Sequence, residues 1–191
     1  MKKIENSFIN FLLEHNIITN EEVPIYRYGF IVTIQLSLCL LSCLVISFLL
    51  EMLIGSFIFW GIFSLLRSYT GGIHLKKYWK CYLLSVFVHT LVLVFSKKNI
   101  MDLTVAATLI IIICGILFLI RPINHPNRTV SYEEDRAFHK MKNRNIILVF
   151  VFSLCLYFAH MEEYLSLISY TLIAILLSAL AGENMQKLFL G

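Results

Sequence analysis

The chain has 191 residues, of which 59% are hydrophobic and 15% are charged, and its mean hydropathy is +0.79. Soluble domains have about 45–50% apolar and about 25% charged residues, so this composition excludes a soluble globular protein and predicts an integral membrane protein. The net charge of +4 is small, and the basic residues flank apolar segments. This placement favours the lipid bilayer surface or an acidic partner, and we expect no nucleic acid partner.

Residues 1–29 form a mixed segment ahead of the apolar runs. One helical stripe of this segment carries the apolar residues Ile4, Phe8, Phe11 and Leu12. The pattern predicts an N-terminal amphipathic helix that lies on the membrane. The segment lacks an unbroken apolar core and a small-residue cleavage site, so we expect no cleavable signal peptide. Thr19 and Glu22 have capping-box spacing, which indicates the start of a second, short helix.

Six apolar runs follow and predict an all-α integral membrane protein, with residues 1–191 forming a single membrane domain. The runs cover residues 30–50, 52–66, 82–96, 103–120, 146–159 and 164–181. A transmembrane helix needs about 20 residues, within a range of about 17–25. The first, fourth and sixth runs satisfy this length, whereas the others need flanking residues. We expect about six transmembrane helices; four spans with two re-entrant or interfacial segments are the alternative.

Basic residues gather in alternate connections between these runs. The segments 1–29, 67–81 and 121–145 are all basic, and a six-span arrangement places them on the same side. The positive-inside rule makes that side cytoplasmic. Only Lys97 and Lys98 run against the pattern. We therefore expect a multi-pass protein of the cell membrane with both termini on the cytoplasmic side.

The cytoplasmic polar segment 121–145 has structural signals of its own. Two prolines mark an irregular start. Ser131 and Glu134 have capping-box spacing, which predicts a helix that begins near Tyr132. Both a solvated loop and a contribution to substrate binding fit this composition.

The stretch Arg67–Cys81, RSYTGGIHLKKYWKC, interrupts the apolar pattern with residues that can carry chemistry. His74 and Cys81 form a histidine–cysteine pair at a polar–apolar boundary. A cysteine attacks as the thiolate, which a neighbouring imidazole generates by accepting the proton and nearby cations stabilise. The cations of this stretch are Lys76, Lys77 and Lys80. These ingredients suit a thiol peptidase or an acyl transferase.

The spacing of the pair places a condition on the backbone. In a straight α-helix, the seven residues from His74 to Cys81 extend about 10.5 Å along the axis. A direct hydrogen bond needs heavy atoms within about 3.2 Å, so a continuous helix would keep the two side chains apart. Gly71 and Gly72 allow the chain to turn just upstream. We therefore expect a re-entrant or broken segment around 67–81.

Each of these residues also has an ordinary structural interpretation. The glycines fit a simple loop, Arg67 fits a side chain that reaches the headgroups, and His74 fits a satisfied interfacial polar group. His89, further into the third run, is either a packing residue or a polar partner. The histidines show no known metal-ligand spacing, so we expect neither a metal nor a cofactor.

The motif R-x3-GG-x-H-x6-C resembles the signature of the accessory gene regulator B (AgrB) family. It is formed by Arg67, Gly71, Gly72, His74 and Cys81. Members of this family are membrane endopeptidases that mature the peptide pheromones of Gram-positive quorum-sensing systems. The resemblance covers almost the whole chain, including the polar middle segment and two final spans. It implies that His74 and Cys81 are the catalytic pair, supported by Arg67 and Gly72.

The resemblance also implies a substrate and a reaction on the cytoplasmic side. The substrate would be an AgrD-type propeptide with an amphipathic leader, a central Cys or Ser, and an acidic C-terminal tail. Cys81 would cleave at the tail junction and hold the peptide as a thioester, which the central residue attacks to close a thiolactone or lactone ring. The candidate contacts for the tail are Lys76, Lys77, Lys80, Lys140 and Lys142. The resemblance further implies a homodimer.

Two other classes of function fit the residue types alone. In a membrane transporter or assembly partner, the histidine and the cysteine would be structural. Transport is disfavoured because the apolar runs contain few ionisable residues beyond His89. A membrane thiol acyltransferase that acts on lipid would use the same histidine and cysteine.

Overall fold

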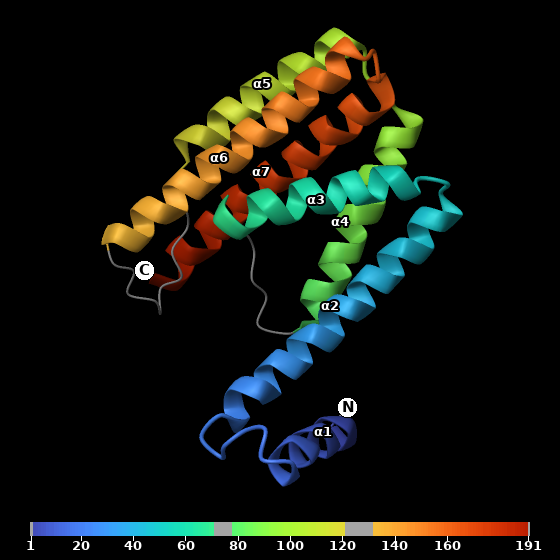
Figure 1. Ribbon diagram of the computed structural model, residues 1–191. Coiled ribbons are helices and arrows are strands. Elements are labelled where there is room, and N and C mark those ends of the chain that lie inside the picture. Colours follow the sequence, from blue (N-terminus) through green and yellow to red (C-terminus); the bar gives the residue numbers. More distant parts are fainter. Residues whose placement is uncertain (1, 71–77, 121–131, 191) are drawn as a thin grey trace.

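The computed structural model describes residues 2–70, 78–120 and 132–190, and these residues form helices and no strand (Figure 1). In chain order the helices are α1 (Lys2–Glu14), α2 (Val23–Leu49), α3 (Leu53–Thr70), α4 (Tyr78–Lys98), α5 (Leu103–Leu119), α6 (Tyr132–Phe158) and α7 (Glu162–Leu190). The predicted all-α class is therefore confirmed.

Five of the helices, α2, α3, α4, α6 and α7, are long and apolar enough to cross a membrane. Helix α5 has 17 residues and no charged side chain, which is the lower end of the length of a span. The six predicted apolar runs thus correspond to six helices, as expected for a multi-pass membrane protein.

Helix α2 begins well before the apolar run that predicted it. Thr19 donates hydrogen bonds from its backbone N–H (2.9 Å) and its hydroxyl (3.0 Å) to the Glu22 carboxylate. The bond from the backbone N–H is the main cause that lowers the pKa of Glu22. Pro24 then occupies the first turn of α2, where a missing N–H costs nothing. The prediction of a separate short helix here is wrong, because the signal precedes α2 itself.

Helix α6 combines two elements that were predicted separately, the helix that begins near Tyr132 and the apolar run 146–159. It begins at Tyr132, which confirms the predicted start, and continues without a break to Phe158. Its first turn carries Glu133, Glu134 and Asp135, whose charges suit the positive end of the helix dipole. The C-terminal part of the polar segment is therefore the first half of a membrane helix.

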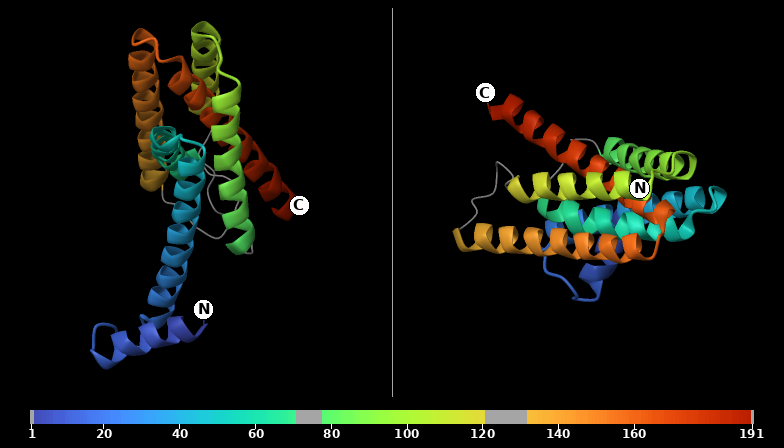
Figure 2. Two further views of the ribbon diagram at one scale, coloured as in Figure 1. Left: turned by 90° about the vertical axis from the view of Figure 1, so that its right-hand side faces the viewer. Right: turned by 90° about the horizontal axis from the view of Figure 1, so that it is seen from above.

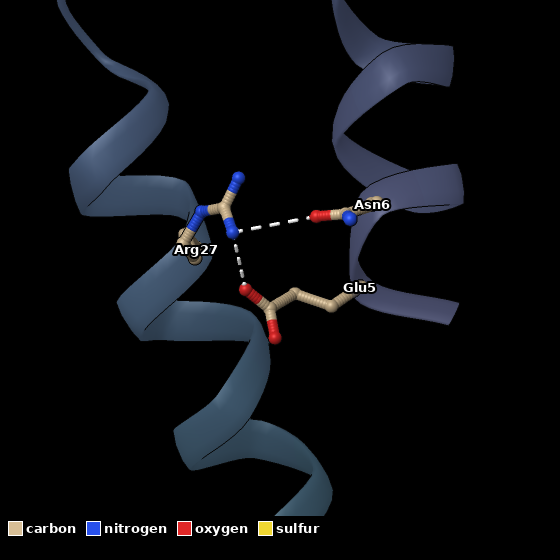
Figure 3. Close-up of polar contacts among 3 residues, drawn as sticks. All are labelled: Glu5, Asn6 and Arg27. Carbon is tan, nitrogen blue, oxygen red and sulfur yellow. Dashed lines mark hydrogen bonds and ion pairs between the residues drawn. The ribbon is translucent and has the colours of Figure 1, made fainter. Parts of the chain in front are cut away.

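The predicted amphipathic N-terminal helix is α1, which lies across the N-terminal end of α2 (Figure 2). Arg27 donates hydrogen bonds to Glu5 at 2.7 Å and to Asn6 at 3.4 Å (Figure 3). Phe8 stacks on Phe30 with the ring centroids 4.5 Å apart. Phe11, which the predicted apolar stripe includes, is 51% exposed. Leu12 of the predicted stripe is buried, as is Ile9, which the stripe does not include.

Helix α7 forms the centre of the bundle and packs against α3, α4, α5 and α6 (Figure 1). Its inward side chains are almost completely buried, among them Leu165, Leu167, Ile168 and Leu172. Helix α2 lies at the edge of the bundle, packs against α3 and α4, and exposes most of its apolar surface. Lipid can cover such a surface because a helix satisfies its backbone hydrogen bonds internally.

Candidate active site

The signature residues that the structure describes lie at the end of α3 and the start of α4. Arg67 is in the last turn of α3, and Cys81 is the fourth residue of α4. The two helices run in different directions (Figure 1), whereas the predicted break between His74 and Cys81 stays a prediction because residues 71–77 lie outside the described residues. Gly71, Gly72, His74, Lys76 and Lys77 lie outside the described residues.

Arg67 and Cys81 are the two members of the signature that the structure describes. Both residues are partly buried, and the Arg67 guanidinium lies 5.2 Å from the centroid of the Phe63 ring, in a cation–π contact. An arginine keeps its positive charge in proteins. A sulfur anion at Cys81 would lie in the first turn of α4, at the positive end of the helix dipole.

Helix α6 holds the last turns of α3 in place. The Asn145 side-chain N–H donates to the Leu65 carbonyl at 2.9 Å, and the Tyr69 hydroxyl donates to the Met141 sulfur at 3.2 Å. The Tyr69 ring also lies 5.8 Å from the Phe138 ring. These contacts fix the backbone that carries Arg67. Asn145 was not predicted as part of the site, because the sequence shows it only as an amide at the edge of an apolar run.

The start of α4 is held by α2. The hydroxyl groups of Tyr82 and Ser42 share a hydrogen bond of 2.7 Å, and Tyr82 directly follows Cys81. Lys80 is exposed, and its ammonium group lies 5.9 Å from the Trp79 ring centroid. Among the lysines of the signature stretch, Lys80 is described by the structure, and its charge is exposed.

Lys140 and Lys142, which the sequence grouped as substrate contacts, have different surroundings. Lys142 has no exposed surface, and its ammonium group donates to the carbonyls of Phe118, at 3.1 Å, and Ile120. It thus caps the C-terminal end of α5, where the helix dipole favours a cation. Lys140 is exposed. Only Lys140 of this pair presents its charge to a substrate in this structure.

The different surroundings predict different effects on stability. Lys142→Met should destabilise the protein by about 1–3 kcal/mol, because charge-assisted hydrogen bonds to buried carbonyls are lost. Lys140→Met, the matched control on the same helix, should have little effect because its side chain is exposed. The measurement is thermal unfolding of the detergent-solubilised protein. Equal melting temperatures for the two variants would contradict the capping role of Lys142.

His89 lies in the core rather than near Cys81. Its Nε2 atom is 2.8 Å from the Ser56 hydroxyl, so it is a polar partner as well as a packing residue. Within the described ranges 2–70, 78–120 and 132–190, no three His, Cys, Asp or Glu side chains are grouped as metal ligands would be.

The family model and the relatives that match this chain are all named for accessory gene regulator B. The family model for accessory gene regulator B matches residues 5–182, which include every candidate site residue. "Putative AgrB-like protein 2" of Clostridium perfringens (strain 13 / Type A) is 26% identical over 141 residues, and "Putative AgrB-like protein" of strain SM101 is 27% identical over 141 residues. Each alignment covers 70% of this chain but only 65% of the relative. No solved structure matches the chain.

Proposed function

Because this chain belongs to the accessory gene regulator B family, we propose that it is a membrane-embedded cysteine endopeptidase. It removes the C-terminal tail of an AgrD-type propeptide and promotes cyclisation of the remaining peptide. Family membership supports a part in the maturation of accessory gene regulator peptides. The observation that carries the finer proposal is the partly buried position of Cys81 in the first turn of α4, where the positive end of the helix dipole stabilises negative charge.

The first step cleaves the tail. His74 accepts the Cys81 proton, and the sulfur attacks the carbonyl carbon at the tail junction, forming an S–C bond. The C–N bond then breaks as His74 returns the proton to the amine of the departing tail. The peptide remains on Cys81 as a thioester.

The second step closes the ring. The central Cys or Ser of the peptide attacks the thioester carbonyl and forms a new S–C or O–C bond. The C–S bond to Cys81 breaks, and the proton of the attacking group passes through His74 to the departing sulfur, which restores the thiol. The exchange consumes no water, so the site must keep water from the thioester. The partly buried position of Cys81 at the edge of an apolar helix suits this requirement.

Arg67 has an electrostatic role in this proposal. Its guanidinium stabilises the anionic sulfur before attack, and its stacking on Phe63 holds the charge in place. The contacts of Asn145 and Met141 on α6 with Leu65 and Tyr69 on α3 support the same backbone. Gly71 and Gly72 allow the chain to bring His74 back to Cys81.

The acidic tail of the substrate is bound by cations. Lys80 on α4 and Lys140 on α6 are exposed, and Lys76 and Lys77 of the signature stretch also contribute. We place the site and both termini on the cytoplasmic side, and we propose that the protein acts in the membrane as a homodimer. Lys142 contributes indirectly, through its cap on α5.

Removing the exposed cation at position 140 should weaken substrate binding. Lys140→Gln is expected to raise KM about two- to fivefold with kcat unchanged, because exposed ion pairs contribute about 0.2–1 kcal/mol. The difference from wild type should shrink as salt screens the charges. The measurement is tail release in proteoliposomes at low and high ionic strength. An unchanged KM at low salt would remove Lys140 from the tail site.

The function itself is tested by co-expression with an AgrD-type propeptide. The wild-type protein should release the acidic tail and yield a ring-closed peptide, both identified by mass spectrometry. A transporter or assembly partner would leave the propeptide intact. A lipid acyltransferase would modify lipid and leave the tail attached.

A further inference from the structure

Helices α3 and α6 lie side by side (Figure 2) and leave a groove of about 430 Å³ between them. The groove is lined by apolar side chains and by Gly61. Of the lining residues, Ile62 and Val149 are buried, whereas Phe57 and Leu148 are more than half exposed. A depression of this size and lining is typical of a site for an apolar ligand.

Gly61 is the part of α3 where the groove is most open. A Cβ atom at Gly61 would meet no atom within 4 Å. By contrast, a Cβ atom at Gly55 on the same helix would lie 3.3 Å from a methyl group of Leu167. A larger side chain at position 61 would therefore occupy the groove without displacing the neighbouring side chains.

Two polar side chains lie one helical turn beyond one end of the groove. Leu65 of α3 and Leu148 of α6 line this end, and Tyr69 and Arg144 are four residues further along the respective helices, on the same faces. The Tyr69 hydroxyl donates to the Met141 sulfur at 3.2 Å, and the Arg144 guanidinium approaches the same sulfur at 3.9 Å. A thioether is a weak acceptor, so both donors remain available to a stronger one.

The surface of α6 at this end of the groove is positively charged. Arg136, Lys140 and Arg144 are exposed and four residues apart, so they form one stripe on the helix. Like charges at this spacing repel each other, and the ion pairs that the structure describes lie elsewhere in the chain. Glu133 offsets one charge, but it lies three residues before Arg136, at the far end of the stripe. An anion bound at Arg144 would reduce the repulsion.

These features match the two parts of an anionic phospholipid. The groove lies between two helices that are long and apolar enough to cross a membrane, where an acyl chain can fill it. A phosphate accepts two parallel hydrogen bonds from an arginine, and anionic lipids are attracted to basic residues next to a membrane helix. A soluble acidic partner would match the cations but not the groove. A symmetric contact with a second copy would bring two basic stripes together.

We propose that the groove between α3 and α6 binds an anionic phospholipid, with one acyl chain along Gly61 and the phosphate at Arg144 and Tyr69. The lipid lies against the last turns of α3, just before the signature stretch. Because it binds the native state, it stabilises the fold. The proposal goes beyond the proposed function and does not depend on it, since peptide cleavage is not needed for lipid binding.

The test measures lipid binding to the full-length, detergent-solubilised protein by native mass spectrometry. The probes are phosphatidylglycerol and phosphatidylcholine with the same acyl chains. The wild type should bind phosphatidylglycerol about fivefold more tightly than phosphatidylcholine, because only the former carries a net negative charge. Gly61→Phe should weaken phosphatidylglycerol binding about tenfold, because the ring excludes part of the acyl chain. Arg144→Gln should weaken it about fivefold.

Two matched controls test whether these effects are specific to the groove. Gly115→Phe adds the same ring to α5 at a position where a Cβ atom also meets no atom within 4 Å. Arg136→Gln removes a cation of the same stripe, eight residues before Arg144. Both variants should bind phosphatidylglycerol within about twofold of the wild type, because neither residue borders the groove.

Thermal unfolding gives a second readout on the same proteins. Phosphatidylglycerol should raise the melting temperature of the wild type and of Gly115→Phe more than that of Gly61→Phe. Gly61→Leu fills less of the groove and keeps the test decisive if Gly61→Phe does not fold. Equal affinity of the wild type for the two lipids, or wild-type affinity of Gly61→Leu for phosphatidylglycerol, would overturn the proposal. Altered self-association of the position-61 variants with unchanged lipid binding would also overturn it and assign the groove to a second copy.

Discussion

Replacing Cys81 with alanine is expected to reduce release of the propeptide tail by about 10³-fold or more. The variant has no sulfur to form the acyl-enzyme, and the remaining groups only bind and orient the substrate. His74→Ala should lower the rate by a similar factor, because nucleophile and base act as a unit and their losses do not add. The rate is measured by mass spectrometry of the released tail in proteoliposomes.

The chain offers a matched control for this experiment. Cys155 is an exposed cysteine on α6, and Cys155→Ala should cleave the propeptide at the wild-type rate. This control shows whether the loss of any cysteine lowers the rate, or only the loss of Cys81 at the end of the signature stretch. Tail release by Cys81→Ala at a rate near wild type would contradict the assignment of the nucleophile.

Arg67→Gln is expected to lower kcat/KM about 10²-fold, a loss typical of removing a preorganised charge or donor from a reacting centre. Arg67→Lys should fall between this variant and the wild type. A lysine keeps the positive charge but loses the planar group that lies over Phe63. The measurement is steady-state tail release, with kcat and KM resolved separately.

Lys80→Gln is the matched control for Arg67. It removes a cation of the same signature stretch, one residue before Cys81, whose ammonium group is exposed and lies near Trp79. We expect at most a fewfold rise in KM, because solvent screens exposed charges. If Arg67→Gln and Lys80→Gln had equal effects on kcat, the specific role of Arg67 would be lost.

Much of the helical architecture could be predicted from the apolar runs, but the ends of the helices could not. A hydropathy pattern marks where side chains prefer lipid, whereas a helix ends where its backbone hydrogen bonds end. The α2 helix therefore starts at Val23, and α6 continues through both polar and apolar sequence from Tyr132. The α1 helix was predicted, but of its predicted stripe Phe11 is exposed, and Ile9 outside the stripe is buried.

The candidate site, like the helices, could be predicted from the sequence only in part. The motif alone predicts Arg67 and Cys81 as site residues, since both belong to one stretch of sequence. The contact between Asn145 and Leu65 depends on how α6 packs against α3, which no spacing reveals. The different surroundings of Lys140 and Lys142 could have been predicted, because residues two apart on a helix point to nearly opposite faces.

The central claim is that Cys81 carries the peptide as a thioester, and it can be observed directly. A propeptide whose central Cys or Ser is replaced by alanine can be cleaved but cannot cyclise, so it should accumulate on the enzyme. Incubated with wild-type protein in proteoliposomes, it should give a hydroxylamine-sensitive adduct on the Cys81 peptide, with the mass of the propeptide without its tail. Release of the tail while Cys81 remains unmodified and free to react with iodoacetamide would contradict the account.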